Sequence, residues 1–186
     1  TVYAVAGRCY VDSARADDVA IKPLMKHYTD LRREDFALTG EQRMPTSALL
    51  PMGGAVSNVA GANWALIGDA AACINPLNGE GIDYGLETGR LLVDHLDDDL
   101  SVVWPALLQE NYGEAFSIAR RLAGVFTTPK ILSALGPVGM RSDWLMTLAL
   151  RWMGNLITEE DRDRSARVWR WAGRRSVAVD ARPPFS

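Results

Sequence analysis

Residues 64–82 read WALIGDAAACINPLNGEGI, an apolar run followed by a loop with two closely spaced glycines. The apolar run, residues 64–67, is too short for a helix and stops at Gly68-Asp69. Beyond Ile82, apolar residues recur mostly at helical intervals: Leu86, Leu91, Leu92, Val93 and Leu96. We therefore predict a strand, a loop and a helix that runs from Ile82 to Asp98.

The loop has the composition of a ligand-binding turn. Pro76 fixes one backbone angle, whereas Gly79 and Gly81 permit positive φ and place no side chain between the backbone and a ligand. The N–H groups in the first turn of the following helix favour an electron-rich or anionic group. Asp69 lies just past the carboxyl end of the predicted strand, where its carboxylate can accept hydrogen bonds from a hydroxylated ligand.

The loop resembles the second flavin-binding motif of FAD-dependent oxidoreductases that have the hydroxybenzoate-hydroxylase type of fold. The matching residues are Gly68-Asp69-Ala70-Ala71, Pro76, Gly79 and Gly81-Ile82. The resemblance implies that Asp69 holds the ribityl chain of FAD and that the backbone at the helix start faces the pyrimidine edge of the isoalloxazine. A reduced flavin concentrates negative charge at that edge, which suits the positive end of a helix.

A longer match points to one group within that superfamily. Residues 75–84 (NPLNGEGIDY) and Thr88-Gly89-Arg90 are similar to the geranylgeranyl reductase and menaquinone reductase family, which saturates isoprenoid double bonds. Leu50-Pro51-Met52-Gly53 is similar to an element that precedes the Gly-Asp motif in that family, although such a run also suits a simple turn. Ala72 and Asp83 stand where aromatic hydroxylases commonly have His and Asn, which disfavours a hydroxylase.

The resemblance implies an α/β fold class: the C-terminal part of a hydroxybenzoate-hydroxylase-like FAD-binding fold, with a few strands before a mostly helical C-terminal region. We expect residues 1–60 to end a substrate domain, residues 61–100 to form the second FAD-binding motif, and residues 101–186 to be helical. The implied cofactor is FAD, and the expected FAD-binding residues are Gly68, Asp69, Pro76, Asn78, Gly79, Glu80, Gly81 and Ile82.

Half of such a cofactor site is missing from the sequence. A strand, a Gly-x-Gly-x-x-Gly turn and a helix normally hold the FAD pyrophosphate, but the glycines at positions 7, 40, 53, 54 and 61 do not have that spacing. We expect a C-terminal portion of a longer enzyme, whose N-terminal half completes the site. Its implied substrate is an isoprenoid, either a polyprenyl quinone or a prenyl diphosphate or lipid.

Composition excludes several other classes of protein. The chain has 186 residues and a net charge of −3, so nucleic acid is not an expected partner. Cys9 and Cys73 are far apart and match no metal or redox spacing. No signal peptide or membrane-spanning apolar run is visible, which favours a cytoplasmic protein.

The other elements follow from apolar periodicity and turn residues. We predict strands over residues 1–11, 46–52 and 55–59, with Gly53-Gly54 between the last two. Helices are predicted from Pro23 to Arg33, from Pro105 to Phe126, and from a Ser142-Asp143 cap to Met153, with breaks at residues 127–129 and at Gly136-Pro137. A last helix is predicted to begin at residues 158–161, and residues 181–186 are expected to be a tail.

Two helical segments allow more than one interpretation. Residues 142–157 are apolar on most sides, which suits a helix buried in the core, but also one that walls an isoprenoid tunnel or rests on a bilayer. The last helix carries many arginines and two tryptophans, which suits a solvated helix or a surface that meets anionic lipid headgroups. A last helix that meets anionic lipid headgroups would place this cytoplasmic protein at the inner face of the membrane.

No residue in the sequence is predicted to be catalytic, and none to bind metal. Cys73 lies inside the loop, but an apolar Cys at this place is expected to pack rather than to react. Glu80 and Asp83 occupy the first turn of a helix, where carboxylates are stabilising in any case. An FAD-dependent aromatic monooxygenase and a non-enzymatic helical module that binds membrane or protein remain the alternative hypotheses.

Overall fold

The computed structural model describes residues 21–41, 50–126, 129–158 and 160–186. The chain divides into two units, Thr1–Leu49 and Leu50–Ser186. The predicted strand over residues 1–11 and most of the one over residues 46–52 lie outside the described residues. In the first unit, α1 (Ile21–Leu31) confirms the helix predicted from Pro23, with Met25 buried and His27 exposed.

The second unit begins with the turn predicted at Gly53-Gly54, but the strand predicted over residues 55–59 is wrong, because these residues form no strand. Gly53 and Gly54 both have positive φ, and their N–H groups donate to the carbonyls of Ile74 and Ala72, each at 2.9 Å. The backbone of this turn is therefore bonded to the loop, not to a strand. Strand pairing starts only at β1 (Ala60–Gly61), which is antiparallel to β2 (Trp64–Ala65).

The predicted strand over residues 64–67 is shorter than expected. β2 ends at Ala65, although the Leu66 N–H still donates to the Val59 carbonyl at 2.7 Å. The chain then forms the short 3-10 helix η2 (Gly68–Ala71) and the loop that leads to α2 (Ile82–Val93). The start of α2 at Ile82 confirms the prediction, but the helix ends at Val93 rather than at Asp98.

The 27-residue helix α3 (Leu100–Phe126) contacts β1 and β2 as well as later helices of the second unit. The predicted start at Pro105 is too late. The helix begins at Leu100 because the Asp99 carboxylate accepts the Ser101 N–H at 3.1 Å and caps the helix. Every fourth residue from Trp104 to Phe116 is buried, and the Trp104 indole N–H donates to the Leu66 carbonyl at 2.8 Å. The long helix thereby holds the end of β2 in place.

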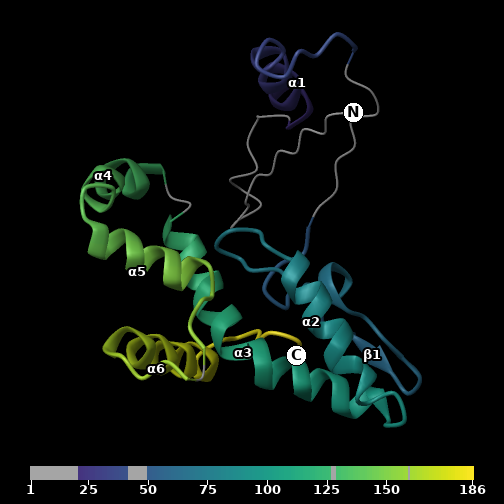
Figure 1. Ribbon diagram of the computed structural model, residues 1–186. Coiled ribbons are helices and arrows are strands. Elements are labelled where there is room, and N and C mark those ends of the chain that lie inside the picture. Colours follow the sequence, from purple (N-terminus) through teal and green to yellow (C-terminus); the bar gives the residue numbers. More distant parts are fainter. Residues whose placement is uncertain (1–20, 42–49, 127–128, 159) are drawn as a thin grey trace. The chain divides into compact units, whose positions relative to one another are not determined.

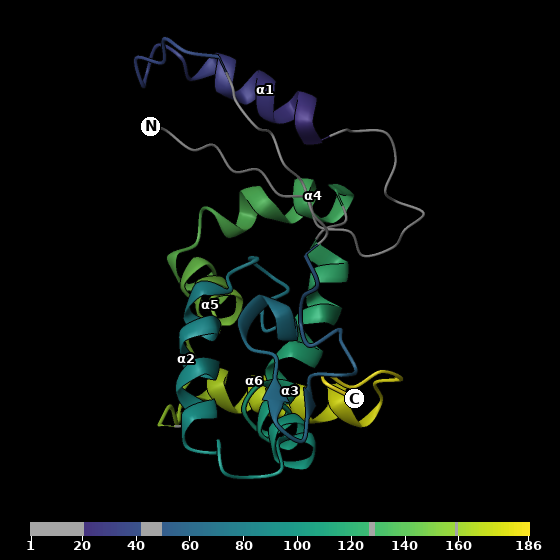
Figure 2. The same cartoon turned by 90° about the vertical axis from the view of Figure 1, so that its right-hand side faces the viewer.

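The carboxyl-terminal residues belong to the core and are not the tail predicted for residues 181–186. Phe185 is 2% exposed, packs against Phe116 and donates its N–H to the Gly54 carbonyl at 2.9 Å. Figures 1 and 2 both show this yellow segment running back to α3. Its core partners are Val59, Ala71, Cys73, Tyr84, Leu100, Trp104, Leu108, Tyr112 and Phe116.

Three further helices follow α3: α4 (Pro129–Gly139), α5 (Asp143–Met153) and α6 (Arg164–Ala178). The break predicted at Gly136-Pro137 is wrong, because α4 continues through this pair to its last turn. The Ser142 cap of α5 is confirmed, since its hydroxyl accepts the Leu145 N–H. α6 starts at Arg164 rather than near Thr158, because Asp163 caps it through the Ala166 N–H at 2.8 Å.

The expectation that residues 142–157 pack in a core is wrong for α5. No residue of α5 is buried; Trp144 is 70% exposed and Leu150 is 60% exposed. Several large apolar side chains of this helix therefore face solvent. Within the ranges that the structure describes, no helix combines the length and the apolar character required to cross a membrane.

Candidate functional site

The loop from Gly68 to Ile82 is held by its own backbone at its first turn. The Cys73 N–H donates to the Gly68 carbonyl at 2.9 Å, and the Ala72 N–H donates to the Asp69 carbonyl at 3.0 Å. Ala72 ends η2 in the left-handed conformation with φ of 55°. This turn reverses the chain directly after β2 and leaves Asp69 exposed.

Gly68 joins this turn to α2. Its N–H donates to the Thr88 hydroxyl at 3.0 Å, and that hydroxyl donates to the Tyr84 carbonyl at 2.6 Å. A Cβ added to Gly68, whose φ is +53°, would lie 3.1 Å from the Gly85 Cα. Glycine at both positions therefore brings the two backbones together and sets the distance between Asp69 and the start of the helix.

Asn75 closes the second turn of the loop. Its backbone N–H donates to the Glu80 carbonyl at 2.8 Å, and its carbonyl accepts the Gly79 N–H at 2.9 Å. Its side-chain oxygen accepts the Leu77 N–H at 2.9 Å, while its amide nitrogen donates to the Met153 carbonyl at 2.8 Å. This buried residue was not among the expected site residues, although an Asn before Pro-Leu-Asn-Gly is a recognisable turn signal.

The tip of the loop is open. The Asn78 side chain accepts the Glu80 N–H at 2.9 Å and donates to the Glu80 carboxylate at 3.1 Å, and both residues are exposed. Gly79 has φ of +77°, and a Cβ added there would meet no atom within 4 Å. Asn78 and Glu80 therefore shape the tip, while Gly79 presents bare backbone to the space above it. Pro76, in contrast, is buried under the loop.

Asp69, Gly81 and Ile82 come together where the loop enters α2. A Cβ on Gly81 would lie 2.8 Å from the Asp69 carboxylate oxygen, so glycine leaves this carboxylate beside the helix start. No side chain caps the first turn of α2, and no described residue bonds the Asp69 carboxylate. Ile82 is 85% exposed. The structure thus brings a free carboxylate and the positive end of a helix to one exposed edge.

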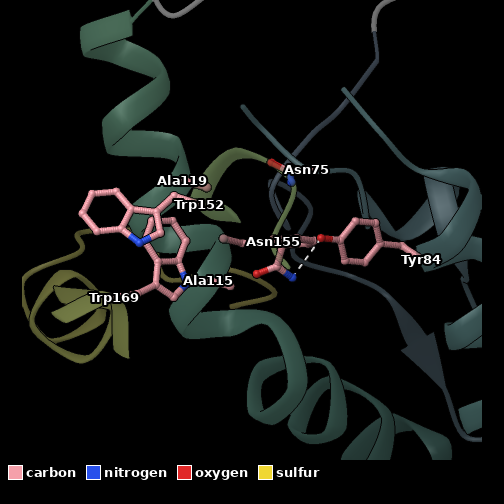
Figure 3. A pocket seen from close by; sticks show the side chains of 8 residues that line it. Asn75, Tyr84, Ala115, Ala119, Trp152, Asn155 and Trp169 are labelled. Carbon is pink, nitrogen blue, oxygen red and sulfur yellow. Dashed lines mark hydrogen bonds between the residues drawn. The ribbon is translucent and has the colours of Figure 1, made fainter. Parts of the chain in front are cut away.

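A narrow hollow lies behind the loop, where α2, α3, α5 and α6 meet (Figure 3). The Asn155 side chain donates to the Tyr84 hydroxyl at 3.0 Å, and Trp152 stacks on Trp169 with ring centroids 5.6 Å apart. Burial raises the pKa of Tyr84 to about 12, so its phenol stays neutral. The hollow leaves no room for a water-sized molecule and serves as packing between the loop and the C-terminal helices.

Curated menaquinone reductases match almost the whole chain. The protein from two strains of Mycobacterium tuberculosis is 61% identical over 175 residues, which are 94% of this chain and 43% of that protein. The protein from Mycolicibacterium smegmatis is 61% identical over 176 residues, which are 92% of this chain and 43% of that protein. The chain is homologous to the carboxyl-terminal part of mycobacterial menaquinone reductases.

The match supports the resemblance to menaquinone reductases that residues 75–84 and 88–90 suggested. It also shows that the chain spans 43% of the length of the menaquinone reductases it matches. No family model matches the chain, and no solved structure matches it. The described residues form a mostly helical protein with a two-stranded sheet, which is consistent with the expected α/β class.

Cys73 has the packing role expected from the sequence. Its side chain is fully buried, and desolvation raises the pKa of the thiol to about 12. At neutral pH the thiol is therefore protonated and unreactive. In the part of the chain that the structure describes, no three His, Cys, Asp or Glu side chains are grouped as metal ligands.

Proposed function

We propose that this chain is the C-terminal portion of an FAD-dependent oxidoreductase that saturates an isoprenoid double bond of menaquinone. The name of its relatives, menaquinone reductase, supports an oxidoreductase acting on this quinone. The observation that carries the flavin assignment is the edge formed by the free Asp69 carboxylate and the uncapped first turn of α2.

The residues of this edge fit a flavin by their chemistry. The Asp69 carboxylate would accept hydrogen bonds from ribityl hydroxyl groups, and the first-turn N–H groups of α2 would donate to the pyrimidine edge of the ring. Gly79 and Gly81 add no side chain that would fill the space next to these groups. Asn78, Glu80 and Pro76 hold the loop in shape, and Ile82 exposes an apolar side chain beside it.

Bound FAD would supply the hydride for the reduction of a prenyl double bond. The chain's own contribution is electrostatic and geometric: the positive end of α2 stabilises negative charge at the pyrimidine edge, and the bonded turns hold the loop in one conformation. Cys73 supplies no proton to this edge because it is buried and its pKa is raised. We assign the proton donor to the part of the relatives that this chain does not span.

In this proposal, the other half of the cofactor site also belongs to the N-terminal part of the relatives, which this chain does not span. α2 carries an apolar stripe on one side: Ile82 is 85% exposed, Leu86 75% and Val93 64%. A stripe of this size on one helix face normally packs against protein. It supports a contact between α2 and the segment that would hold the FAD pyrophosphate and most of the substrate pocket.

The test uses the chain joined to the N-terminal part of a relative. Purified protein should carry flavin absorbance, and with a reductant it should add two hydrogens to a menaquinone, as read by mass spectrometry. A gain of one oxygen instead would show a monooxygenase. Correctly folded protein that neither carries flavin nor alters the quinone would contradict the proposal and favour a non-enzymatic helical module.

A further inference from the structure

One face of α6 combines arginine with tryptophan. At 100° per residue, six exposed residues fall on the same side of the helix: Arg164, Arg167, Val168, Trp171, Arg174 and Arg175. We call this set the arginine face. Trp171 is 57% exposed and Val168 is 51% exposed near its centre. The face is therefore amphipathic, with an apolar centre and cationic surroundings.

The opposite side of α6 fixes how this face is presented. Ala166, Trp169, Gly173 and Ser176 are buried, and a Cβ on Gly173 would lie 3.1 Å from the Glu114 backbone of α3. The Ser176 hydroxyl is hydrogen-bonded to the Ser117 hydroxyl at 2.7 Å. Because these buried residues pack against α3, the arginine face lies on the side of α6 that points away from α3. Figure 1 shows α6 next to α3.

The arginines of this face differ from other arginines of the same unit. Arg120 pairs with Asp180, Arg151 pairs with Asp161 and Asp163, and Arg170 donates to the Thr158 and Asp161 carbonyls. The guanidinium groups of the four arginines of the arginine face have no hydrogen bond or ion pair to any described residue, and the sequence of α6 contains no acidic residue. Among the described residues, no ion pair offsets this positive charge, in a chain whose net charge is −3.

The centre of the face is hollowed and aromatic. Arg164, Arg167, Val168 and Trp171 line an open surface hollow of about 450 Å³. The Arg175 guanidinium lies 5.7 Å from the centre of the Trp171 ring. A Trp ring with apolar and polar edges is suited to the headgroup level of a bilayer, and guanidinium groups around it are suited to lipid phosphates.

We propose that the arginine face binds the surface of an anionic lipid bilayer, with Trp171 at the headgroup level and the four arginines on lipid phosphates. Charge complementarity favours an anionic partner. The exposed side chains of Trp171 and Val168 favour a lipid surface over an acidic protein, because an acidic protein would pair with the arginines and leave these apolar side chains without a partner. This inference goes beyond the flavin proposal and does not depend on it. Such binding would hold the chain at the lipid bilayer, where polyprenyl lipids reside.

The experiment is sedimentation of the 186-residue chain with vesicles, either of phosphatidylcholine alone or with phosphatidylglycerol. We expect binding only to the anionic vesicles and weaker binding at higher salt. The double variant Arg164→Gln/Arg167→Gln should weaken partitioning about 30-fold, since each arginine near such a surface contributes about fivefold. The control Arg90→Gln/Arg141→Gln removes the same charge from exposed positions outside α6 and should bind nearly as the parent does.

Fluorescence gives a second readout at the aromatic centre. Anionic vesicles should shift the tryptophan emission of the parent to the blue, and Trp171→Phe should lose that shift while its circular dichroism stays unchanged. Absence of binding to anionic vesicles, or equal loss in the control double variant, would overturn the proposal. Binding to a soluble polyglutamate without binding to vesicles would also overturn it, by assigning the face to an acidic protein.

Discussion

At the scale of single residues, Gly68, the first residue of η2, is where the turn after β2 contacts α2. Its positive φ and the 3.1 Å that would separate an added Cβ from the Gly85 Cα leave no room for a side chain. Gly79 shares the positive φ, but a Cβ there would meet open space. A side chain at Gly79 would therefore carry only the cost of the backbone conformation, whereas a side chain at Gly68 would add the cost of a steric clash.

We expect Gly68→Ala to lower the free energy of unfolding by more than Gly79→Ala does. Both variants carry the cost of a left-handed alanine, about 1–2 kcal/mol, and Gly68→Ala adds an overpacking cost of about 1–3 kcal/mol. Urea unfolding of both variants measures the difference. Equal losses would mean that the contact between Gly68 and Gly85 does not constrain the loop.

The sequence was sufficient to locate the residues that lie within one continuous motif. Asp69, Gly79 and Gly81 could be predicted because their spacing along the chain already places them at the start of one helix. The bonds from Asn75 to Met153 and from Asn155 to Tyr84 could not be predicted, because the bonded residues lie 78 and 71 positions apart in sequence. Whether the expected residues bind FAD stays a prediction.

At the scale of elements, caps explain the helix boundaries that periodicity missed. The helix predicted from Ile82 was extended to Asp98, but α2 ends at Val93 and Asp99 caps the beginning of α3. In the same way, Asp163 rather than Thr158 starts α6, because its carboxylate accepts the Ala166 N–H. Apolar periodicity located the core positions of α3, such as Leu108 and Phe116, but a cap depends on backbone geometry that periodicity does not encode.

Asp163 also gives a prediction about acid stability. The hydrogen bond from Arg151, followed by that from the Ala166 N–H, lowers the pKa of Asp163 from 3.8 to about 2. Because the folded pKa is lowered, the stabilisation is complete above 3.8 and is lost as the pH falls towards 2. Asp163→Asn keeps a cap oxygen but loses the charge, so its deficit relative to the parent should shrink over this range.

Unfolding free energies measured at several pH values test this expectation. Asp143→Asn is the control, since Asp143 is exposed in the first turn of α5 and its carboxylate has no hydrogen bond or ion pair to the described residues. The effect of Asp143→Asn should change less with pH than that of Asp163→Asn. A deficit in Asp163→Asn that does not change with pH would show that the Arg151 pair contributes nothing in solution.

At the scale of the whole molecule, the carboxyl-terminal segment returns to the first turn of its unit. Phe185 packs on Phe116 and bonds to Gly54, which in turn bonds to the loop through Ala72. We expect Phe185→Ala to lower the free energy of unfolding by about 3–5 kcal/mol, as for other buried phenylalanines. Phe126→Ala, at a residue that is 41% exposed, should cost clearly less in the same urea titration.

A small loss in Phe185→Ala, similar to that in Phe126→Ala, would mean that the segment does not support the core. The role of this segment could not be predicted from the sequence, because Ala-Arg-Pro-Pro-Phe-Ser at a chain end is typical of a tail. Burial of Phe185 depends on contacts with Gly54 and with Phe116 of α3, which form only when the second unit folds.

The central claim is that the edge formed by Asp69 and the first turn of α2 holds a flavin. Its most direct test is the FAD dissociation constant of the chain joined to the N-terminal part of a relative, measured for the parent, Asp69→Ala and the exposed control Asp94→Ala. Loss of hydrogen bonds to a carboxylate should weaken binding by at least about tenfold in Asp69→Ala, with Asp94→Ala unchanged. Unaltered FAD affinity in a correctly folded Asp69→Ala would contradict the claim.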